Sequence, residues 1–84
     1  MYLHLGGNTV VNSRDIVGIF DLDTVTVTKL GRDYINRASL EGKVINVTFD
    51  LPKSFVLTKE EGEEKLYISQ LAPATLLKRA KIGN

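Results

Sequence analysis

The sequence predicts an α+β fold: a small antiparallel-rich sheet with one central helix and a short C-terminal helix. Three observations favour this class. Strand-like alternation occurs on both sides of the chain's middle, residues 26–40 repeat apolar side chains at helical spacing, and Pro73 stands where a second, short helix would begin. The chain has 84 residues, so we expect one domain that spans residues 1–84.

The first quarter of the chain predicts a hairpin followed by a buried strand. Tyr2–Leu5 alternates, Gly6-Gly7-Asn8 is a turn signal, and Thr9–Val11 is the returning strand. The next strand should run from residue 15 or 16 to residue 21. It is rich in β-branched and aromatic residues, so we expect both of its faces to be covered. Gly18 is expected to let another backbone approach it closely.

The central segment predicts one helix, from about residue 26 to residue 40. Asp21-Leu22-Asp23-Thr24 offers oxygen atoms for its N-cap, and Gly42 suits its C-terminal stop. Val25–Thr28 is ambiguous, because its β-branched alternation favours a strand. Gly31 should weaken the helix by about 1 kcal/mol relative to alanine. The residues expected to face inward are Val27, Leu30, Tyr34, Ala38 and Ile35.

The second half predicts three more strands and the short helix. Lys43–Phe49 alternates as a strand, and Asp50–Lys53 forms a turn around Pro52. The segments 54–58 and 65–69 should pair as a hairpin. A helix is expected from Ala74 to about Ala80, with Pro73 in its first turn and with Leu76 and Leu77 packing inward.

Composition excludes several classes of function. The chain has no cysteine, so disulfides and thiolate metal sites are excluded. It has neither a signal-peptide pattern nor an apolar run long enough to cross a membrane, which predicts a cytoplasmic protein without a membrane partner. Phosphate-loop and nucleophile-elbow motifs are missing, and His4 is the only histidine. We therefore expect no enzyme activity, no catalytic or metal-binding residue, no cofactor and no small-molecule partner.

Charge is nearly balanced overall but unevenly distributed. There are 11 basic and 10 acidic residues, for a net charge of +1. Residues 59–65 hold four acids and two lysines and are expected to form a solvated hairpin tip. The remainder has 9 basic (11−2) and 6 acidic (10−4) residues, a net charge of +3 that points weakly to a polyanionic partner.

Arg14 is the most informative cation in the sequence. It stands at a polar corner, directly before a predicted buried strand, so it should be both rigidly held and exposed. The structural alternative is a salt bridge to Asp15 or Asp50, or a structural bond across the corner. For the remaining helix cations, a solvated helix face or a favourable interaction with the helix dipole is a sufficient explanation. These cations are Lys29, Arg32, Arg37, Lys78, Arg79 and Lys81.

Several segments resemble the small bacterial extracellular-matrix regulatory proteins of the Rem family, closest to its B-type members. The likeness covers most of the chain and is strongest in the first quarter and at the end. It is carried by Met1–Gly7, Val10-Val11, Ser13–Asp21, Pro52-Lys53-Ser54, Tyr67-Ile68-Ser69 and Thr75–Arg79.

The resemblance implies a non-enzymatic regulator of biofilm-matrix genes that binds double-stranded DNA as a ring-like or other closed homo-oligomer. The family's arginine after the first hairpin corresponds to Arg14. A pair of arginines in A-type members corresponds to Leu51-Pro52, so this chain departs there, and Lys53 is the nearest cation. The DNA-binding residues expected on this basis are Arg14 and Lys53. The alternative function is a protein-interaction module that assembles without touching DNA.

Overall fold

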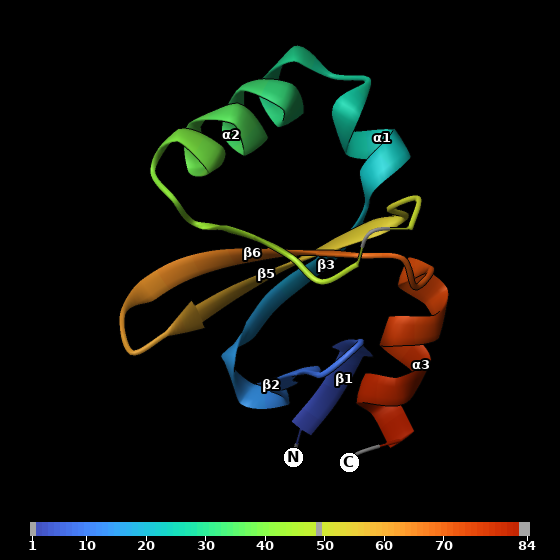
Figure 1. Ribbon diagram of the computed structural model, residues 1–84. Helices are drawn as coiled ribbons and strands as arrows, with labels where there is room; N and C mark the ends of the chain where they lie inside the picture. Colours follow the sequence, from blue (N-terminus) through green and yellow to red (C-terminus); the bar gives the residue numbers. More distant parts are fainter. Residues whose placement is uncertain (1, 49, 83–84) are drawn as a thin grey trace.

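The computed structural model describes residues 2–48 and 50–82. Within them, the chain forms six strands, three α-helices and one short 3-10 helix (Figure 1). In chain order these elements are β1 (Tyr2–Gly6), β2 (Thr9–Asn12), η1 (Ser13–Asp15), β3 (Ile16–Asp21), α1 (Leu22–Thr26), α2 (Lys29–Leu40), β4 (Val44–Asn46), β5 (Ser54–Glu60), β6 (Glu63–Ser69) and α3 (Pro73–Ile82).

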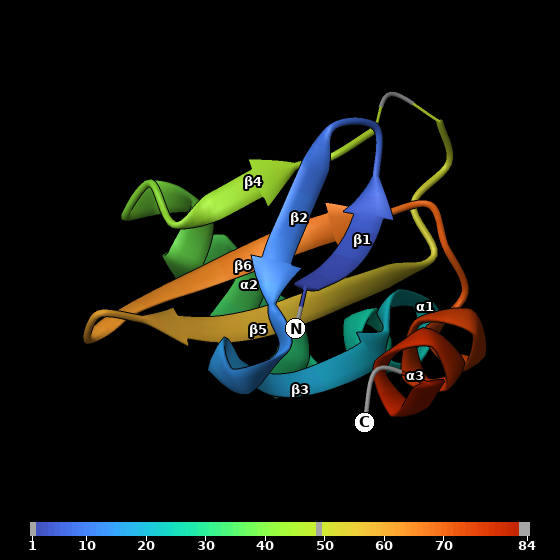
Figure 2. The same cartoon turned by 90° about the horizontal axis from the view of Figure 1, so that it is seen from below.

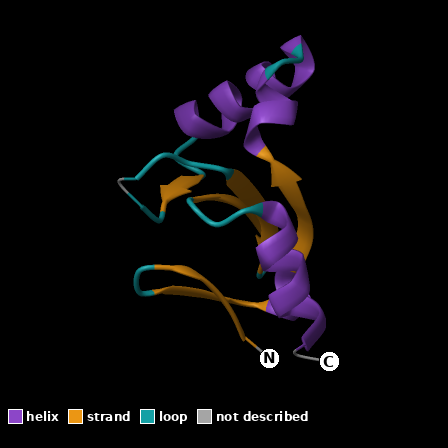
Figure 3. Cartoon of the chain, turned by 90° about the vertical axis from the view of Figure 1, so that its right-hand side faces the viewer, coloured by secondary structure: helices purple, strands orange, loops and turns teal. Residues whose placement is uncertain are grey.

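The elements stack in three layers. A four-stranded sheet with the order β3-β5-β6-β4 forms the middle layer, and only the β4–β6 pairing is parallel. Helices α1 and α2 lie on one side of this sheet (Figures 1 and 3). The two-stranded β1-β2 sheet and α3 lie on the other side, where the hairpin crosses the larger sheet (Figure 2). The predicted α+β class with mostly antiparallel pairing is confirmed, although the strands form two sheets instead of one.

The first core joins the hairpin, the sheet and α3. Alternation along β1 and β2 turns Leu3, Leu5 and Val11 inward, and they meet Val56 of β5 and Leu76 of α3. Burying a leucine side chain contributes about 1.5–3 kcal/mol. One hydrogen bond ties this layer to the sheet, because the Ser69 hydroxyl donates to the carbonyl of Leu5 over 2.7 Å. The N-terminal hairpin is therefore an integral part of the domain.

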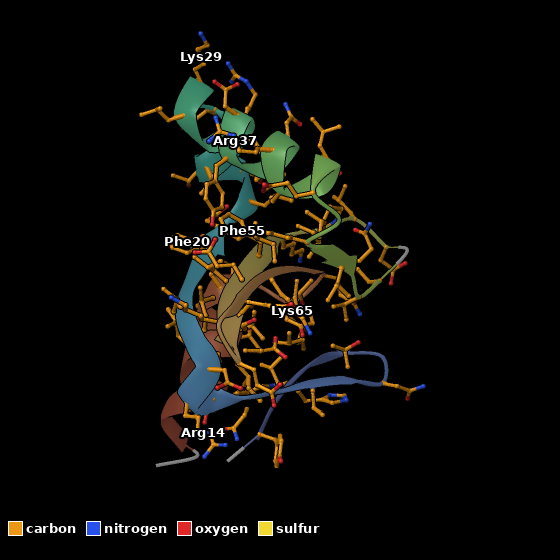
Figure 4. The ribbon with its side chains drawn as sticks, turned by 90° about the vertical axis from the view of Figure 1, so that its left-hand side faces the viewer. Arg14, Phe20, Lys29, Arg37, Phe55 and Lys65 are labelled. Atoms are coloured by element: carbon orange, nitrogen blue, oxygen red, sulfur yellow. The ribbon has the colours of Figure 1, made fainter. Side chains whose placement is uncertain are left out.

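The second core lies between α1, α2 and the opposite face of the sheet. Phe55, Leu66 and Ile68 project from β5 and β6 toward Ala38 of α2, and Leu22 of α1 packs against this cluster. Phe55 also stacks on Phe20, with 4.8 Å between the ring centroids (Figure 4). These contacts hold the helical layer on the sheet.

The prediction that β3 is covered on both faces is wrong. β3 lies at the edge of the sheet and pairs only with β5. Val17 is 62% exposed and Phe20 is 39% exposed. The close approach at Gly18 is also different from the expected one, because the ring of Phe20, and not another backbone, would lie 2.6 Å from an added Cβ atom. Apolar composition alone could not tell an edge strand from a central one.

The central helix is divided in two. Asp21 caps α1 by accepting from the amide of Asp23, and Thr28 caps α2 by accepting from the amide of Gly31. The helical structure therefore begins at Leu22 instead of residue 26, and it is interrupted at residues 27–28. The ambiguity at Val25–Thr28 is resolved without a strand, because Val25 and Thr26 belong to α1.

The inward face of α2 was predicted only in part. Ala38 is buried and Ile35 is half-buried, as expected. Leu30, in contrast, is 84% exposed, Val27 is 74% exposed and Tyr34 is 41% exposed. The break takes Val27 out of the helix. Leu30 and Tyr34 stay on the same stripe of α2 as Ala38, so burial along that stripe falls off toward the N-terminal end of the helix.

The remaining elements lie close to their predicted places. β4 is shorter than expected, and Phe49 lies outside the described residues. The β5–β6 hairpin runs to a two-residue turn at Glu61-Gly62, where both φ angles are positive. α3 begins at Pro73 and buries Leu76, but Leu77 is about half exposed. The prediction of an inward Leu77 is therefore wrong.

Candidate nucleic-acid interface

Arg14 lies in η1, the short helix that joins the N-terminal hairpin to β3. The side chain of Asn12 caps η1 by accepting from the backbone amide of Arg14 at 3.2 Å. On the far side of the turn, Ile16 starts β3 and packs against the first core. The backbone of Arg14 is thus fixed from both sides, while the residue itself is exposed.

The Arg14 guanidinium has no acidic partner among the described residues. The salt bridges there join Lys43 to Glu41 at 3.5 Å and Lys65 to Glu60 at 3.7 Å. The alternative in which Arg14 pairs with Asp15 or Asp50 is therefore not what this structure shows. An exposed arginine on a fixed backbone, with its five donors unpaired, is suited to bind an oxyanion such as a phosphate.

Lys53 lies at the opposite end of β3. Its backbone amide donates to the carbonyl of Ser69 and its carbonyl accepts from Leu22, so the loop before β5 is held between β6 and α1. Lys53 lines a surface groove of about 280 Å³ together with Asp21 and Asp23. Two carboxylates near a single ammonium leave a local excess of negative charge, which makes this the less favourable place for a polyanion.

The structure does not bring the two predicted DNA-binding residues together. They flank β3, whose six residues at ~3.3 Å each span roughly 20 Å. The loop before β5, which holds Lys53, also carries Leu51, and Leu51 is 79% exposed where the resemblance placed an arginine. Arg14 and Lys53 are therefore two separate positions on one subunit and not one composite site.

The cations of α2 form a separate surface. Lys29 and Arg37 are both exposed on α2, and Figure 4 shows Lys29 projecting away from the sheet. Arg32 donates from Nη1 to the carbonyl of Thr26 at 2.9 Å, which satisfies the end of α1. The expectation that these residues lie on the polar side of the helix is confirmed.

Sequence reasoning missed a polar cluster at the base of the acidic tip. Oε2 of Glu60 accepts from the Tyr67 hydroxyl at 2.7 Å and from the Thr58 hydroxyl at 2.6 Å. Partial burial raises the pKa of Glu60, but these two donors and the charge of Lys65 outweigh it and leave the pKa below its ordinary value. Burial, followed by the Glu60 carboxylate, raises the pKa of Tyr67 to about 12. Glu60 is thus not the solvated tip residue that the sequence predicted.

A second groove lies between α2 and β6. It measures about 290 Å³ and includes Tyr34, Arg37 and Glu64 among its lining residues. Burial and the nearby Glu64 carboxylate raise the pKa of Tyr34. Charges of both signs line this groove, and the described residues contain no group of three or more potential metal ligands.

Within residues 2–48 and 50–82, no helix has the length and apolar character needed to cross a membrane.

Comparisons with known proteins agree with the resemblance seen in the sequence. The family model "RemA-like: Extracellular matrix regulatory protein A-like" matches residues 2–80. The chain is 37% identical over 81 residues to extracellular matrix regulatory protein B of Bacillus subtilis (strain 168). That alignment covers 96% of this chain and 91% of its relative. The chain therefore belongs to the RemA-like family of extracellular matrix regulatory proteins.

Proposed function

We propose that this protein is a non-enzymatic regulator of biofilm-matrix genes that binds double-stranded DNA as a closed homo-oligomer. Arg14 supplies the principal phosphate contact of each subunit, and Lys53 supplies a weaker one. Membership of a family of extracellular matrix regulators supports the regulatory role. In this proposal the protein acts in the cytoplasm on the nucleoid, without a cofactor.

The observation that carries the proposal is the state of Arg14. It is exposed, its backbone is fixed by the Asn12 cap, and no described acid neutralises it. A planar guanidinium can make two parallel hydrogen bonds to a phosphate, which a lysine cannot. A preorganised arginine therefore gains more from a phosphate than a flexible surface cation does.

Oligomerisation supplies the affinity that one subunit lacks. A net charge of +1 gives a single subunit little attraction for DNA. Repeating one contact around a closed assembly can raise apparent affinity by about 10²–10⁴ when the geometry permits. The exposed apolar side chains Val17, Val27 and Leu30 support self-association, since they are large and largely uncovered in the isolated subunit.

Phosphate contacts carry little base specificity by themselves. In this proposal, the shape and bendability of the promoter DNA select the site, because a closed assembly presents its arginines at fixed spacing.

The same exposed apolar residues favour a second candidate, an assembly module that binds only protein. Leu51 strengthens it, because an exposed leucine stands where the DNA-binding A-type pattern has an arginine. The two candidates differ in what Arg14 does. A DNA-binding protein needs its charge, whereas an assembly module tolerates its loss.

Duplex binding of three proteins at about 50 and 200 mM salt separates the candidates. The wild type should bind a long duplex, Arg14→Ala should bind more weakly with a shallower salt dependence, and Lys53→Ala should show a smaller change in the same direction. Light scattering on the same samples should give one unchanged oligomeric mass. Wild-type protein that binds no duplex at the lower salt would leave the assembly module as the function.

A further inference from the structure

Helix α3 runs back along the edge strand β3. At its N-terminal end, Pro73 lines the same groove as Asp21 and Lys53. Farther along, Leu76 and Ala80 pack in the first core together with Ile16, which begins β3. The C-terminal turns of α3 therefore lie toward the η1 end of β3. Figure 1 shows α3 running down to the end of the molecule that holds the β2–β3 connection, and Figure 4 places Arg14 at that end.

These turns carry exposed cations that no acid neutralises. Lys78 and Arg79 are exposed, and neither takes part in a salt bridge within the described residues. The side chain of Lys81, which the sequence also placed there, is outside the described part of the chain. Arg14 adds a third unpaired charge from η1.

The two ends of β3 therefore differ in charge. The described side chains of η1 and α3 include Arg14, Lys78 and Arg79 against one acid, Asp15, a net charge of +2 (3−1). The other end has Lys53 against Asp21 and Asp23, a net charge of −1 (1−2). A polyanion is attracted to the first end and not to the second.

The acidic tip limits this surface on its other side. Asp15 faces a groove shared with Glu60, Glu61, Glu63 and Lys65, which belong to the β5–β6 hairpin. Phosphates approaching over this groove meet four carboxylates and one ammonium. α3, in contrast, contains no acidic residue, so a phosphate near Arg14 meets less negative charge toward α3 than over this groove.

We propose that Lys78 and Arg79 complete a phosphate-binding surface with Arg14, so that DNA lies across the η1–α3 end of each subunit. The inference rests on the proposed DNA binding and adds the residues that share the contact. It also assigns Lys53 a minor part, because its neighbourhood is acidic.

The helix dipole offers a purely structural role for the same two residues. Cations in the last turn offset the partial negative charge of about one half at the C-terminus of a helix. That partial charge would repel a phosphate, but it acts over only one turn and opposes three full positive charges. A dipole role would make the two side chains matter for thermal stability and leave DNA affinity unchanged.

The test compares DNA binding and melting in one set of full-length variants. The double variant Lys78→Ala/Arg79→Ala removes both charges and retains good helix formers. Lys78→Arg/Arg79→Lys keeps the charges at exchanged positions. Lys29→Ala removes an exposed cation from α2, at the far side of the molecule, and is the matched control. Fluorescence anisotropy with one labelled duplex gives the affinity at each of several salt concentrations.

The double alanine variant should bind about 20- to 60-fold more weakly at about 0.1–0.2 M salt. Each phosphate that is no longer neutralised lowers the DNA affinity by about four- to eightfold at these salt concentrations, because counterion release contributes nothing at the 1 M reference. Losing two such contacts multiplies the two factors. Its plot of log affinity against log salt should be shallower by about 0.9 for each such phosphate per bound unit. The charge-conserving variant and Lys29→Ala should bind like the wild type.

Each contrary result has a separate meaning. A wild type that binds DNA alongside a double alanine variant of equal affinity overturns this inference and leaves the proposed function intact. The inference is also overturned if Lys53→Ala weakens binding more than the double variant does, because the DNA then lies at the other end of β3. A wild type that binds no duplex overturns both. Changed melting with unchanged affinity assigns the two residues to the dipole.

Discussion

Gly31 is the position at which sequence and structure predict opposite effects of one substitution. Alanine is the better helix former by about 1 kcal/mol, so the sequence alone predicts that Gly31→Ala stabilises the protein. In the structure, a Cβ atom at Gly31 would lie 2.1 Å from the carbonyl oxygen of Val25 and 2.9 Å from the Thr28 hydroxyl. Val25 lies in the last turn of α1, and Thr28 is the N-cap of α2. The substitution should therefore destabilise the helical layer.

The size of the effect follows from these contacts. Ordinary contact begins at 3.4 Å, so the carbonyl must retreat by 1.3 Å (3.4−2.1). Overpacking costs about 1–3 kcal/mol, and a backbone neighbour places this case at the upper end. Disturbing the Thr28 cap adds about 1 kcal/mol, and the better helix propensity returns about 1 kcal/mol. We expect a net loss of about 2–3 kcal/mol.

Thermal and urea unfolding followed by circular dichroism will measure this loss. At about 4–8 °C per kcal/mol for a domain of this size, Tm should fall by roughly 8–24 °C. Asn36→Ala, an exposed position on the same helix, is the control and should leave Tm unchanged or raise it slightly. A Gly31→Ala protein that melts at or above the wild-type temperature would refute the α1–α2 contact described here.

Two further predictions concern the β5–β6 hairpin. Because the pKa of Glu60 is lowered in the folded state, its ionised form contributes stability that is present above the ordinary pKa of 4.5 and is lost as pH falls through the folded pKa. Glu60→Gln should therefore reduce the free energy of unfolding near pH 7 and flatten its decline on acidification, as measured by urea unfolding across that pH range. Glu61 holds a φ of +52° before Gly62 in the two-residue turn, so Glu61→Asn should raise stability by about 0.5–1 kcal/mol, and an unchanged or lower unfolding midpoint would count against the turn geometry.

The strands were predictable because short-range signals agree with their tertiary environment. The Gly6-Gly7-Asn8 turn and the alternation on either side of it specify the N-terminal hairpin, which occurs as β1 and β2. Pro73 likewise marks the start of α3. In each of these cases, the local sequence and the buried face require the same conformation.

The errors arise where non-local packing decides the outcome. Whether the run at residues 16–21 forms a central or an edge strand depends on which strands pair with it, and that information is not in the run itself. The break at residues 27–28 depends on Gly31 fitting under the carbonyl of Val25, a contact between two helices. The polar cluster around Glu60 needs Tyr67, which the β5–β6 register places opposite Val56 and whose hydroxyl reaches Glu60.

The candidate site was predictable only in its first member. Arg14 follows a hairpin and precedes an apolar strand, so its exposed and fixed position was visible in the sequence. The distance between Arg14 and Lys53 was not, because both residues are polar neighbours of strands and only the β3–β5 register separates them. The proximity of α3 to η1 required the tertiary fold.

The hydrogen bond between Ser69 and Leu5 joins residues 64 positions apart, and this has a consequence for synthesis of the chain on the ribosome. At ~5–20 residues per second, the hairpin emerges roughly 3 to 13 seconds before the strand that completes its core is made. Leu76 of α3 arrives later still. A two-stranded hairpin is marginal in water by itself. The nascent N-terminal segment thus exposes its apolar face throughout elongation, and the native domain closes only when the last helix leaves the ribosome.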